Sequence, residues 1–128
     1  MKGRYKVAFI YLSSPYSHHD AAVRAQRYRD ALQTVALLMS DGRTVFSPIV
    51  HCHELALTFD LPTSFDFWRN YNLQMLQEAF LISVLCISGW KDSKGVTEEL
   101  KYARGVPMGV SYIYIENNRL LYCPEPLE

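Results

Sequence analysis

The chain has 128 residues, and its 13 basic and 13 acidic side chains give a formal net charge of zero at pH 7. This length supports one domain with a buried core and is too short for two. Balanced charge gives no argument for a nucleic-acid polymer or an anionic membrane as partner. No apolar run approaches the roughly 20 residues that a membrane-spanning helix needs. We therefore expect a single domain over residues 1–128, with neither of these partners.

The first half of the chain predicts a strand, a long helix and a second strand. Residues 5–12 form an apolar, β-rich run, which is typical of a buried strand and lacks the cleavage site of a signal peptide. Asp20 can cap a helix that runs to about Ser40 and ends at Asp41-Gly42. A short strand over residues 44–46 follows.

The second half predicts a long loop, a helix, a strand and a second strand–helix pair. We expect a loop over residues 51–63, long enough for a functional or capping role. The later elements are a helix over 65–79, a strand over 80–88, a loop over 89–94, a helix over 95–104, a strand from Pro107 through Tyr114, a turn at Asn117-Asn118, and a last strand or interface segment over 120–123.

Alternation of strands and helices predicts the fold class. It indicates βαβ crossovers and a parallel sheet covered on both faces. We expect an α/β, Rossmann-like (flavodoxin-like) three-layer sandwich with a central parallel sheet of four or five strands. Ligands bind such sheets outside the carboxyl ends of the strands. Three segments, residues 13–19, 48–63 and 90–95, converge there and predict a pocket for a small molecule.

The spacing of the cysteine and histidine residues bears on the cellular compartment and on metal binding. The three cysteines, Cys52, Cys86 and Cys123, are scattered and have no CxxC spacing, which favours a reducing cytoplasm over a disulfide framework. The run of His, Cys, His and Glu at residues 51–54 lacks the spacing of a zinc finger or a zincin. We therefore expect a cytoplasmic protein with no metal and no organic cofactor.

A glycine turn at Gly95 opens the short helix that carries Glu99. A helix N-terminus favours an anionic group such as phosphate, and a carboxylate close by could act on whatever the phosphate is attached to. The segment becomes informative when it is read with the start of the chain.

Three motifs in this order and spacing, spread over about residues 5–110, resemble the nucleoside 2-deoxyribosyltransferase superfamily. They are Tyr-Leu-Ser-Ser-Pro-Tyr-Ser-His at residues 11–18, Phe-Ser-Pro-Ile at 46–49, and Gly89-Trp90 followed by Ser-Lys-Gly-Val at 93–96 and Glu99. The chain looks closest to a phage and bacterial branch, and the nucleoside 5′-monophosphate N-glycosidases are similar relatives.

The resemblance implies cleavage of the N-glycosidic bond between a base and a (deoxy)ribose. Glu99 matches the family nucleophile, which attacks the anomeric carbon and forms a covalent glycosyl-enzyme, and Tyr11 matches the tyrosine that orients it. Water resolves this intermediate in a hydrolase, and a second base resolves it in a transferase.

The resemblance also implies a phosphate-binding set. Ser93 stands where the similar transferases carry an aspartate and the monophosphate hydrolases a serine, and a neutral hydroxyl there is compatible with phosphate. We therefore expect a nucleoside 5′-monophosphate rather than a free nucleoside. The expected substrate-binding residues are Ser13, Ser14, Pro15, Ser17, His18, Ser93 and Gly95. Arg24 and Arg27 either add positive charge nearby or lie as solvated helix arginines.

Asn72 stands where the family usually has an aspartate that serves the departing base. An amide can hydrogen-bond the base or sugar but has no proton to exchange at neutral pH. Three explanations stay open: a natural variant that uses another acid, a binding-only descendant, or an altered residue that traps substrate. We name Asn72 as a catalytic position together with Glu99 and Tyr11.

Family members complete each pocket with a neighbouring subunit, so the resemblance implies a homodimer or a higher homo-oligomer. The apolar segment over residues 110–122 is the candidate interface. Two rival functions remain beside the hydrolase: a base-exchanging deoxyribosyltransferase and a non-catalytic nucleotide-binding or sensing protein.

Overall fold

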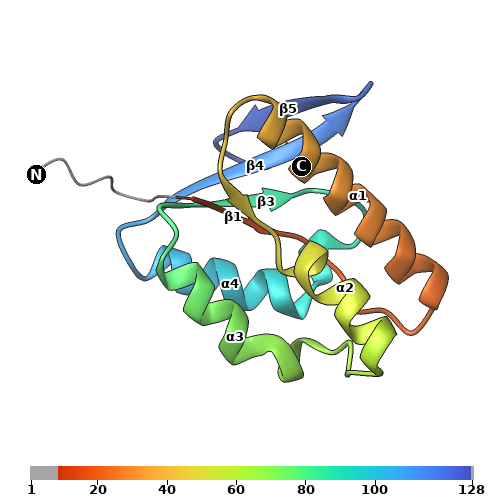
Figure 1. Cartoon of the computed structure of the whole chain (residues 1–128). Coiled ribbons are helices and arrows are strands. Elements are labelled where there is room, and N and C mark those ends of the chain that lie inside the picture. The colour runs from red at the N-terminus through yellow and green to blue at the C-terminus, as the bar shows by residue number, and fades with distance from the viewer. Residues whose placement is uncertain (1–8, 128) are drawn as a thin grey trace, which may run out of the picture.

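A computed structural model describes residues 9–127 and shows an α/β domain built on a five-stranded, mostly parallel sheet (Figure 1). The strand order is β2-β1-β3-β4-β5, which is compatible with a Rossmann-like fold. The strands are β1 Ile10–Ser13, β2 Val45–Phe46, β3 Leu81–Leu85, β4 Gly109–Glu116 and β5 Arg119–Cys123; the helices are α1 Ala21–Ser40, α2 Pro48–Phe59, α3 Phe65–Gln77 and α4 Lys94–Arg104, with a short 3₁₀ helix, η1, at Trp90–Asp92.

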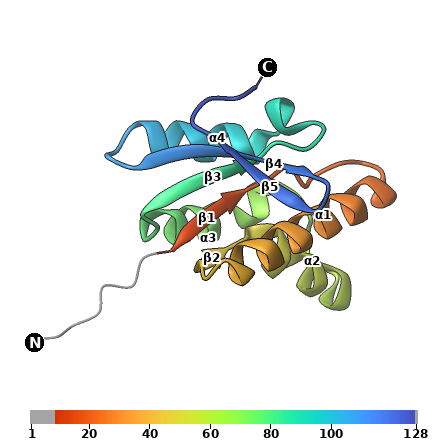
Figure 2. The same ribbon diagram turned by 90° about the horizontal axis from the view of Figure 1, so that it is seen from above.

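The first four strands are parallel, and the fifth is not. β1 pairs in parallel with both β2 and β3, and β3 pairs in parallel with β4. The common direction of β1 and β3 can be followed in Figure 2. β5 instead pairs antiparallel with β4, which corrects the expectation of a wholly parallel sheet. The reason is local: Asn117 and Asn118 take φ values of 53° and 57°, and two such residues form the tight turn of a β-hairpin.

Different helices pack on side chains from alternate positions of the strands. Leu38 of α1 lies in one core cluster with Leu12, Leu85 and Ile113. Tyr11 and Ile82, which are aligned in register, lie instead in a cluster with residues of α3 and α4. Successive residues of a strand point to opposite faces, so these clusters occupy the two faces of the sheet. Tyr11 therefore faces α4, the helix that carries Glu99.

The first long helix agrees with its prediction at both ends. The Asp20 side chain accepts the backbone N–H of Ala22 at 2.9 Å and caps α1. Gly42 follows the helix with a φ of +81°, a conformation that glycine adopts without steric cost. The prediction of a helix from Asp20 to Ser40 is confirmed.

The predicted loop over residues 51–63 is wrong, because most of it is helix α2. Ser47 caps this helix by accepting the Val50 N–H at 3.1 Å, and Pro48 occupies its first position. Proline, with its fixed φ, is pre-organised for the first position of a helix. The helix ends at Asp60, whose φ of 55° is left-handed, and a true loop remains only over residues 60–64.

Several predicted strands also differ in extent, and the fourth begins at Gly109 rather than at Pro107. The third runs over Leu81–Leu85 rather than over 80–88, and the first begins at Ile10, with its predicted residues 5–8 outside the described part of the chain. Within residues 9–127, no helix is long and apolar enough to cross a membrane.

Candidate active site

A cavity of about 270 Å³ opens beyond the carboxyl ends of β1 and β3. The strand order reverses between these two strands, and ligands of open α/β sheets bind at such a reversal. The cavity is lined by residues from the β1–α1 loop, α2, the segment leading into α3, α3, and the start of α4: Ser14, Tyr16, Ser17, Pro48, Ile49, Cys52, Thr63, Ser64, Phe65, Trp68, Asn72, Asp92, Ser93, Lys94, Gly95 and Glu99.

The carboxylate of Glu99 lies in this cavity, held by two hydroxyl groups from β1. The Tyr11 hydroxyl donates to one carboxylate oxygen, Oε2, at 2.7 Å, and the Ser13 hydroxyl donates to the other, Oε1, also at 2.7 Å. Glu99 is 3% exposed, and Tyr11 and Ser13 are fully buried. Both oxygens are therefore fixed in position by neighbours that cannot swing away.

Burial raises the pKa of the Glu99 carboxyl from its ordinary 4.5 to about 7, although the hydrogen bonds from Ser13 and Tyr11 pull it down. The pKa of Tyr11 is raised well above its ordinary value, first by burial and then by the charge of Glu99. Tyr11 therefore stays protonated and keeps donating. A carboxylate that is desolvated in this way is a stronger nucleophile than one in water.

The hydroxyl of Ser14 is buried and has no hydrogen-bond partner, and it is the one such side-chain atom among the described residues. Ser14 is 7% exposed and lines the cavity. An unsatisfied buried hydroxyl is costly, and native structures contain few of them. This atom is placed to be satisfied by a ligand.

The first turn of α4 forms another part of the cavity wall. Ser93 caps the helix by accepting the Val96 N–H at 3.2 Å, and Ser93, Lys94 and Gly95 all line the cavity. A Cβ on Gly95 would lie 3.1 Å from Cδ1 of Phe65, so glycine allows this aromatic wall to approach closely. A helix N-terminus at this point favours an anionic ligand group.

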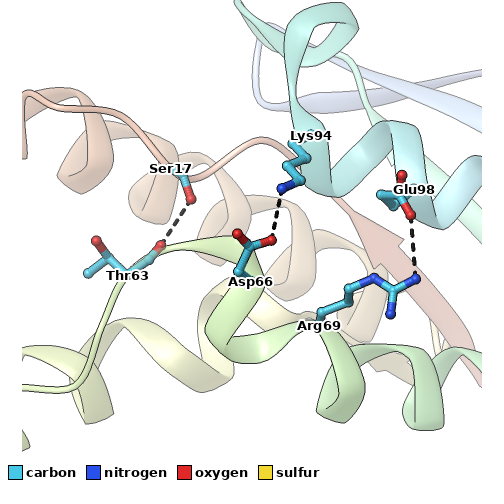
Figure 3. Close-up of polar contacts among 6 residues, drawn as sticks. All are labelled: Ser17, Thr63, Asp66, Arg69, Lys94 and Glu98. Atoms are coloured by element: carbon cyan, nitrogen blue, oxygen red, sulfur yellow. Dashed lines mark hydrogen bonds and ion pairs between the residues drawn. The ribbon is translucent and has the colours of Figure 1, made fainter.

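Polar contacts at the rim join three segments that are distant in sequence (Figure 3). The Ser17 hydroxyl donates to the Thr63 carbonyl at 2.9 Å, which ties the β1–α1 loop to the segment before α3. Lys94 lies 2.8 Å from Asp66, and Arg69 lies 3.6 Å from Glu98, so α3 is joined to α4. Exposed ion pairs of this kind contribute little to stability; they orient α3 beside the cavity.

The wall made by α2 and α3 is largely apolar. Trp68 is 9% exposed, with its indole N–H donating to the Pro62 carbonyl at 2.9 Å. Burial raises the pKa of the Cys52 thiol to about 12, so this side chain is an inert wall rather than a nucleophile. Asn72, one helical turn beyond Trp68, is the polar exception in the part of the wall that α2 and α3 contribute.

A hydroxyl–imidazole pair supports the wall from behind. The Tyr16 hydroxyl lies 2.7 Å from Nδ1 of His53, and the His53 ring stacks on Tyr28 with centroids 4.0 Å apart. Burial raises the pKa of Tyr16 to about 12 and lowers that of His53. The imidazole is therefore neutral and is used for packing and for one hydrogen bond.

The structure brings most of the sequence-predicted residues together. Glu99, Asn72, Ser14, Ser17, Ser93 and Gly95 line the cavity, and Tyr11 and Ser13 reach it through Glu99.

Two other predicted residues, Pro15 and His18, neither line the cavity nor hydrogen-bond to Glu99. Pro15 is fully buried, and His18 is half-buried. Nδ1 of His18 accepts the Asp20 N–H at 3.0 Å. The two arginines act locally: Arg24 donates to the His18 carbonyl, and Arg27 donates to the Ser17 carbonyl at 2.9 Å. They brace the β1–α1 loop through its backbone.

Sequence reasoning did not select several residues of the cavity. Tyr16 lies inside the first motif and Asp92 directly precedes Ser93, so both were within reach of the motif argument. Cys52 was not, because the segment that carries it was expected to be a loop. Cys52 lies three residues after Ile49, and both side chains line the cavity from one face of α2. This helical spacing is the sequence signal that could have identified Cys52 as a cavity residue.

These features define an α/β domain with a buried carboxylate in a ligand-sized cavity at the switch point of its sheet. The model of a family described as a domain of unknown function, DUF1937, matches residues 8–114, and the chain belongs to this family. Among curated proteins no sequence matches the chain.

Proposed function

We propose that this protein hydrolyses the N-glycosidic bond of a (deoxy)nucleoside 5′-monophosphate and releases a free base and (deoxy)ribose 5-phosphate. The observation that carries the proposal is the Glu99 carboxylate, buried in the cavity and oriented by the hydroxyls of Tyr11 and Ser13. A fixed, desolvated carboxylate suits attack on an anomeric carbon, where an oxocarbenium-like transition state develops positive charge.

The chemistry divides into two steps. In the first, a Glu99 oxygen bonds to C1′ of the sugar and the bond from C1′ to the base nitrogen breaks, with its electron pair leaving on the base. In the second, water attacks C1′, the ester to Glu99 breaks, and the carboxylate is restored, while the proton that the water loses neutralises the departed base. Tyr11 and Ser13 hold the carboxylate at both ends throughout, which keeps the attacking oxygen in place.

The phosphate end of the substrate is assigned to the side of the cavity that has hydroxyl donors and a helix N-terminus. The unpartnered Ser14 hydroxyl and the first turn of α4, with Ser93 and Gly95, line the cavity and support this assignment. Ser17 also lines the cavity, with its hydroxyl donating to the Thr63 carbonyl. The base is assigned to the apolar wall, where Trp68 offers an aromatic surface and Asn72 offers an amide.

The test is release of free base, followed by liquid chromatography, from a panel of ribo- and deoxyribonucleoside 5′-monophosphates. Glu99→Gln should abolish release, with a loss of at least about 10³-fold. The matched control is Glu98→Gln, because Glu98 is the adjacent residue on α4, pairs with Arg69 outside the cavity, and should leave the rate within about twofold. Equal losses in both variants would contradict the proposal.

A binding-only nucleotide sensor is the second candidate, and Asn72 favours it because no carboxylic acid stands at that place in the wall. It predicts nucleotide-induced thermal stabilisation with no base released by the natural chain or by Asn72→Asp. A deoxyribosyltransferase would require a second base for turnover.

We further propose that the fold is a flavodoxin-like three-layer sandwich. The strand order 2-1-3-4-5 and the separate core clusters on the two sides of the sheet support it. We also propose that the protein acts as a homodimer or a higher homo-oligomer.

A further inference from the structure

The wall near Asn72 holds no group that is suited to protonate a departing base. The hydroxyl of Tyr16 is engaged with His53, and its pKa is about 12. The thiol of Cys52 is directed at the Ile49 carbonyl, and its pKa is also about 12. Efficient general acids have a pKa near the working pH. Neither group meets that requirement.

Two further ionisable side chains line the cavity, and both lie at its rim. Lys94 is paired with Asp66 at 2.8 Å. Asp92 belongs to η1, is exposed, and directly precedes the Ser93 cap of α4, on the side assigned above to phosphate. The base side of the cavity therefore has no ionisable side chain suited to protonate the base, and Asn72 offers an amide there.

From this arrangement we infer that the site is built for nucleotides whose base already carries a positive charge, such as a purine alkylated at N7 or a pyridinium ring. The inference rests on the proposed function. It names the class of leaving group that the same Glu99 can displace.

The electron balance shows why charge on the base removes the need for an acid. When the bond from C1′ to an ordinary purine N9 breaks, the electron pair leaves an anion on the base unless a proton arrives. When the purine is methylated at N7, the same electron pair cancels the existing positive charge, and a neutral base departs. Glu99 forms its ester to C1′ in both cases. Only the substrate whose base is uncharged before the bond breaks needs a proton donor.

The charges and rings of the cavity agree with a cationic base. Within the described residues, the Glu99 carboxylate is bonded only to the hydroxyls of Tyr11 and Ser13, so no side-chain cation balances it. A cationic substrate supplies that balance and favours the ionised nucleophile. On the base side, the indole of Trp68 presents an aromatic wall that attracts a cation.

The experiment compares two substrates that differ by one methyl group, guanosine 5′-monophosphate and its N7-methylated form, in ribo and deoxyribo versions. Base release is measured with the natural chain and with Asn72→Asp, and each rate is divided by the rate with Glu99→Gln to remove spontaneous loss. We expect the natural chain to prefer the methylated nucleotide by at least about 10²-fold in this normalised kcat/KM. Asn72→Asp should narrow the preference by a similar factor, through faster release of guanine.

Each other outcome has a definite meaning. Equal normalised rates for the two nucleotides in the natural chain would overturn the inference and leave the proposed function standing; loss of guanine release in Asp92→Asn would then identify Asp92 as the acid. Release only from the unmethylated nucleotide, and only by Asn72→Asp, would likewise overturn it. No base from either nucleotide with either chain, and none from the panel of nucleoside 5′-monophosphates described above, would refute the proposed function itself.

Discussion

The raised pKa of Glu99 makes the stability of the folded state depend on pH. Its carboxyl has a pKa of about 7 in the fold against an ordinary 4.5, because burial penalises the charged form. The folded chain therefore holds this proton more tightly than the unfolded chain does. Stability is lost as pH rises from about 4.5 through about 7, by on the order of 3 kcal/mol.

The first prediction follows from this loss of stability with rising pH. Glu99→Gln removes the charge and keeps the size, so its unfolding free energy should exceed that of the natural chain by about 1–3 kcal/mol at pH 8 and match it near pH 5. Urea unfolding at both pH values measures it. Glu98→Gln is the control and should show no such pH trend, because Glu98 is partly exposed. A constant difference between Glu99→Gln and the natural chain at all pH values would refute the explanation.

The second prediction concerns the unpartnered hydroxyl of Ser14. Because this atom has no hydrogen-bond partner, Ser14→Ala should leave stability within about 0.5 kcal/mol or raise it. The same change should weaken nucleotide binding, measured by calorimetry, by about tenfold. Ser13→Ala is the contrast: it removes a donor to Glu99 and should alter stability. Destabilisation of about 1 kcal/mol or more by Ser14→Ala would show that the hydroxyl has a structural role.

The sequence allowed us to predict which residues belong to the site, but not which of them contact one another. Tyr11 and Glu99 were paired through the family resemblance, and the structure shows the pair across 88 positions of the chain. The second donor, Ser13, was expected to bind substrate and instead holds the carboxylate. Which hydroxyl of a Ser-Ser pair faces which partner depends on the alternation of β1 and on where that strand ends. Neither is encoded in residue type alone.

Among the elements, α1 holds the segment between β3 and η1 in place. Gly89 has a φ of +89°, and a Cβ there would lie 2.4 Å from Nη2 of Arg27. The other guanidinium nitrogen of Arg27 donates to the Ser17 carbonyl at 2.9 Å, so the two loops beside the cavity share this arginine. Any side chain at position 89 must push the guanidinium out of place.

The third prediction compares two glycines with similar backbone. Gly42 has a φ of +81° with open space around it, so Gly42→Ala carries only the left-handed strain of about 1–2 kcal/mol. Gly89→Ala carries the same strain and also displaces Arg27, so it should cost about 1 kcal/mol more and weaken nucleotide binding. Denaturant unfolding and calorimetry measure the two effects. Identical behaviour of the two variants would mean that Arg27 does not brace the loops.

Helix α2 marks where element prediction failed. Pro48 lies just after the predicted short strand over residues 44–46, and a proline that follows a serine is also a typical helix start, with the serine as cap. The segment is largely apolar, with Ile49, Cys52 and Ala56 buried on one side. The periodicity of apolar residues alone does not distinguish such a helix from a loop that covers a pocket. Packing against α1 and the cavity decides it.

At the scale of the whole molecule, α1 and α2 lie side by side at one end of the structure, and the β4–β5 hairpin forms an edge of the sheet (Figures 1 and 2). Strand alternation predicted the α/β class correctly, because each βα pair follows from local patterns. The antiparallel edge was not predicted, since it depends on a two-residue turn that reverses the chain.

The fourth prediction concerns assembly. β5 pairs on one side only within the described sheet, and Leu121 and Tyr122 on it are 43% and 41% exposed. Light scattering at micromolar concentration should give a dimer or a larger assembly, and Leu121→Lys should dissociate it. Leu57→Lys on α2, which is 63% exposed, is the matched control and should not dissociate the assembly. A clean monomer in the natural chain would contradict the proposal, and dissociation by Leu57→Lys alone would move the interface to α2.

Intact-protein mass spectrometry can detect the bond that we propose between Glu99 and the sugar. The protein is mixed with the 2′-fluoro-arabino analogue of a nucleotide that it cleaves, because fluorine at C2′ destabilises an oxocarbenium-like transition state and slows turnover. We expect a mass increase equal to one fluoro-sugar 5-phosphate, located on the peptide that contains Glu99 and absent in Glu99→Gln. An adduct on another residue, or base release with no adduct at any time, would contradict it.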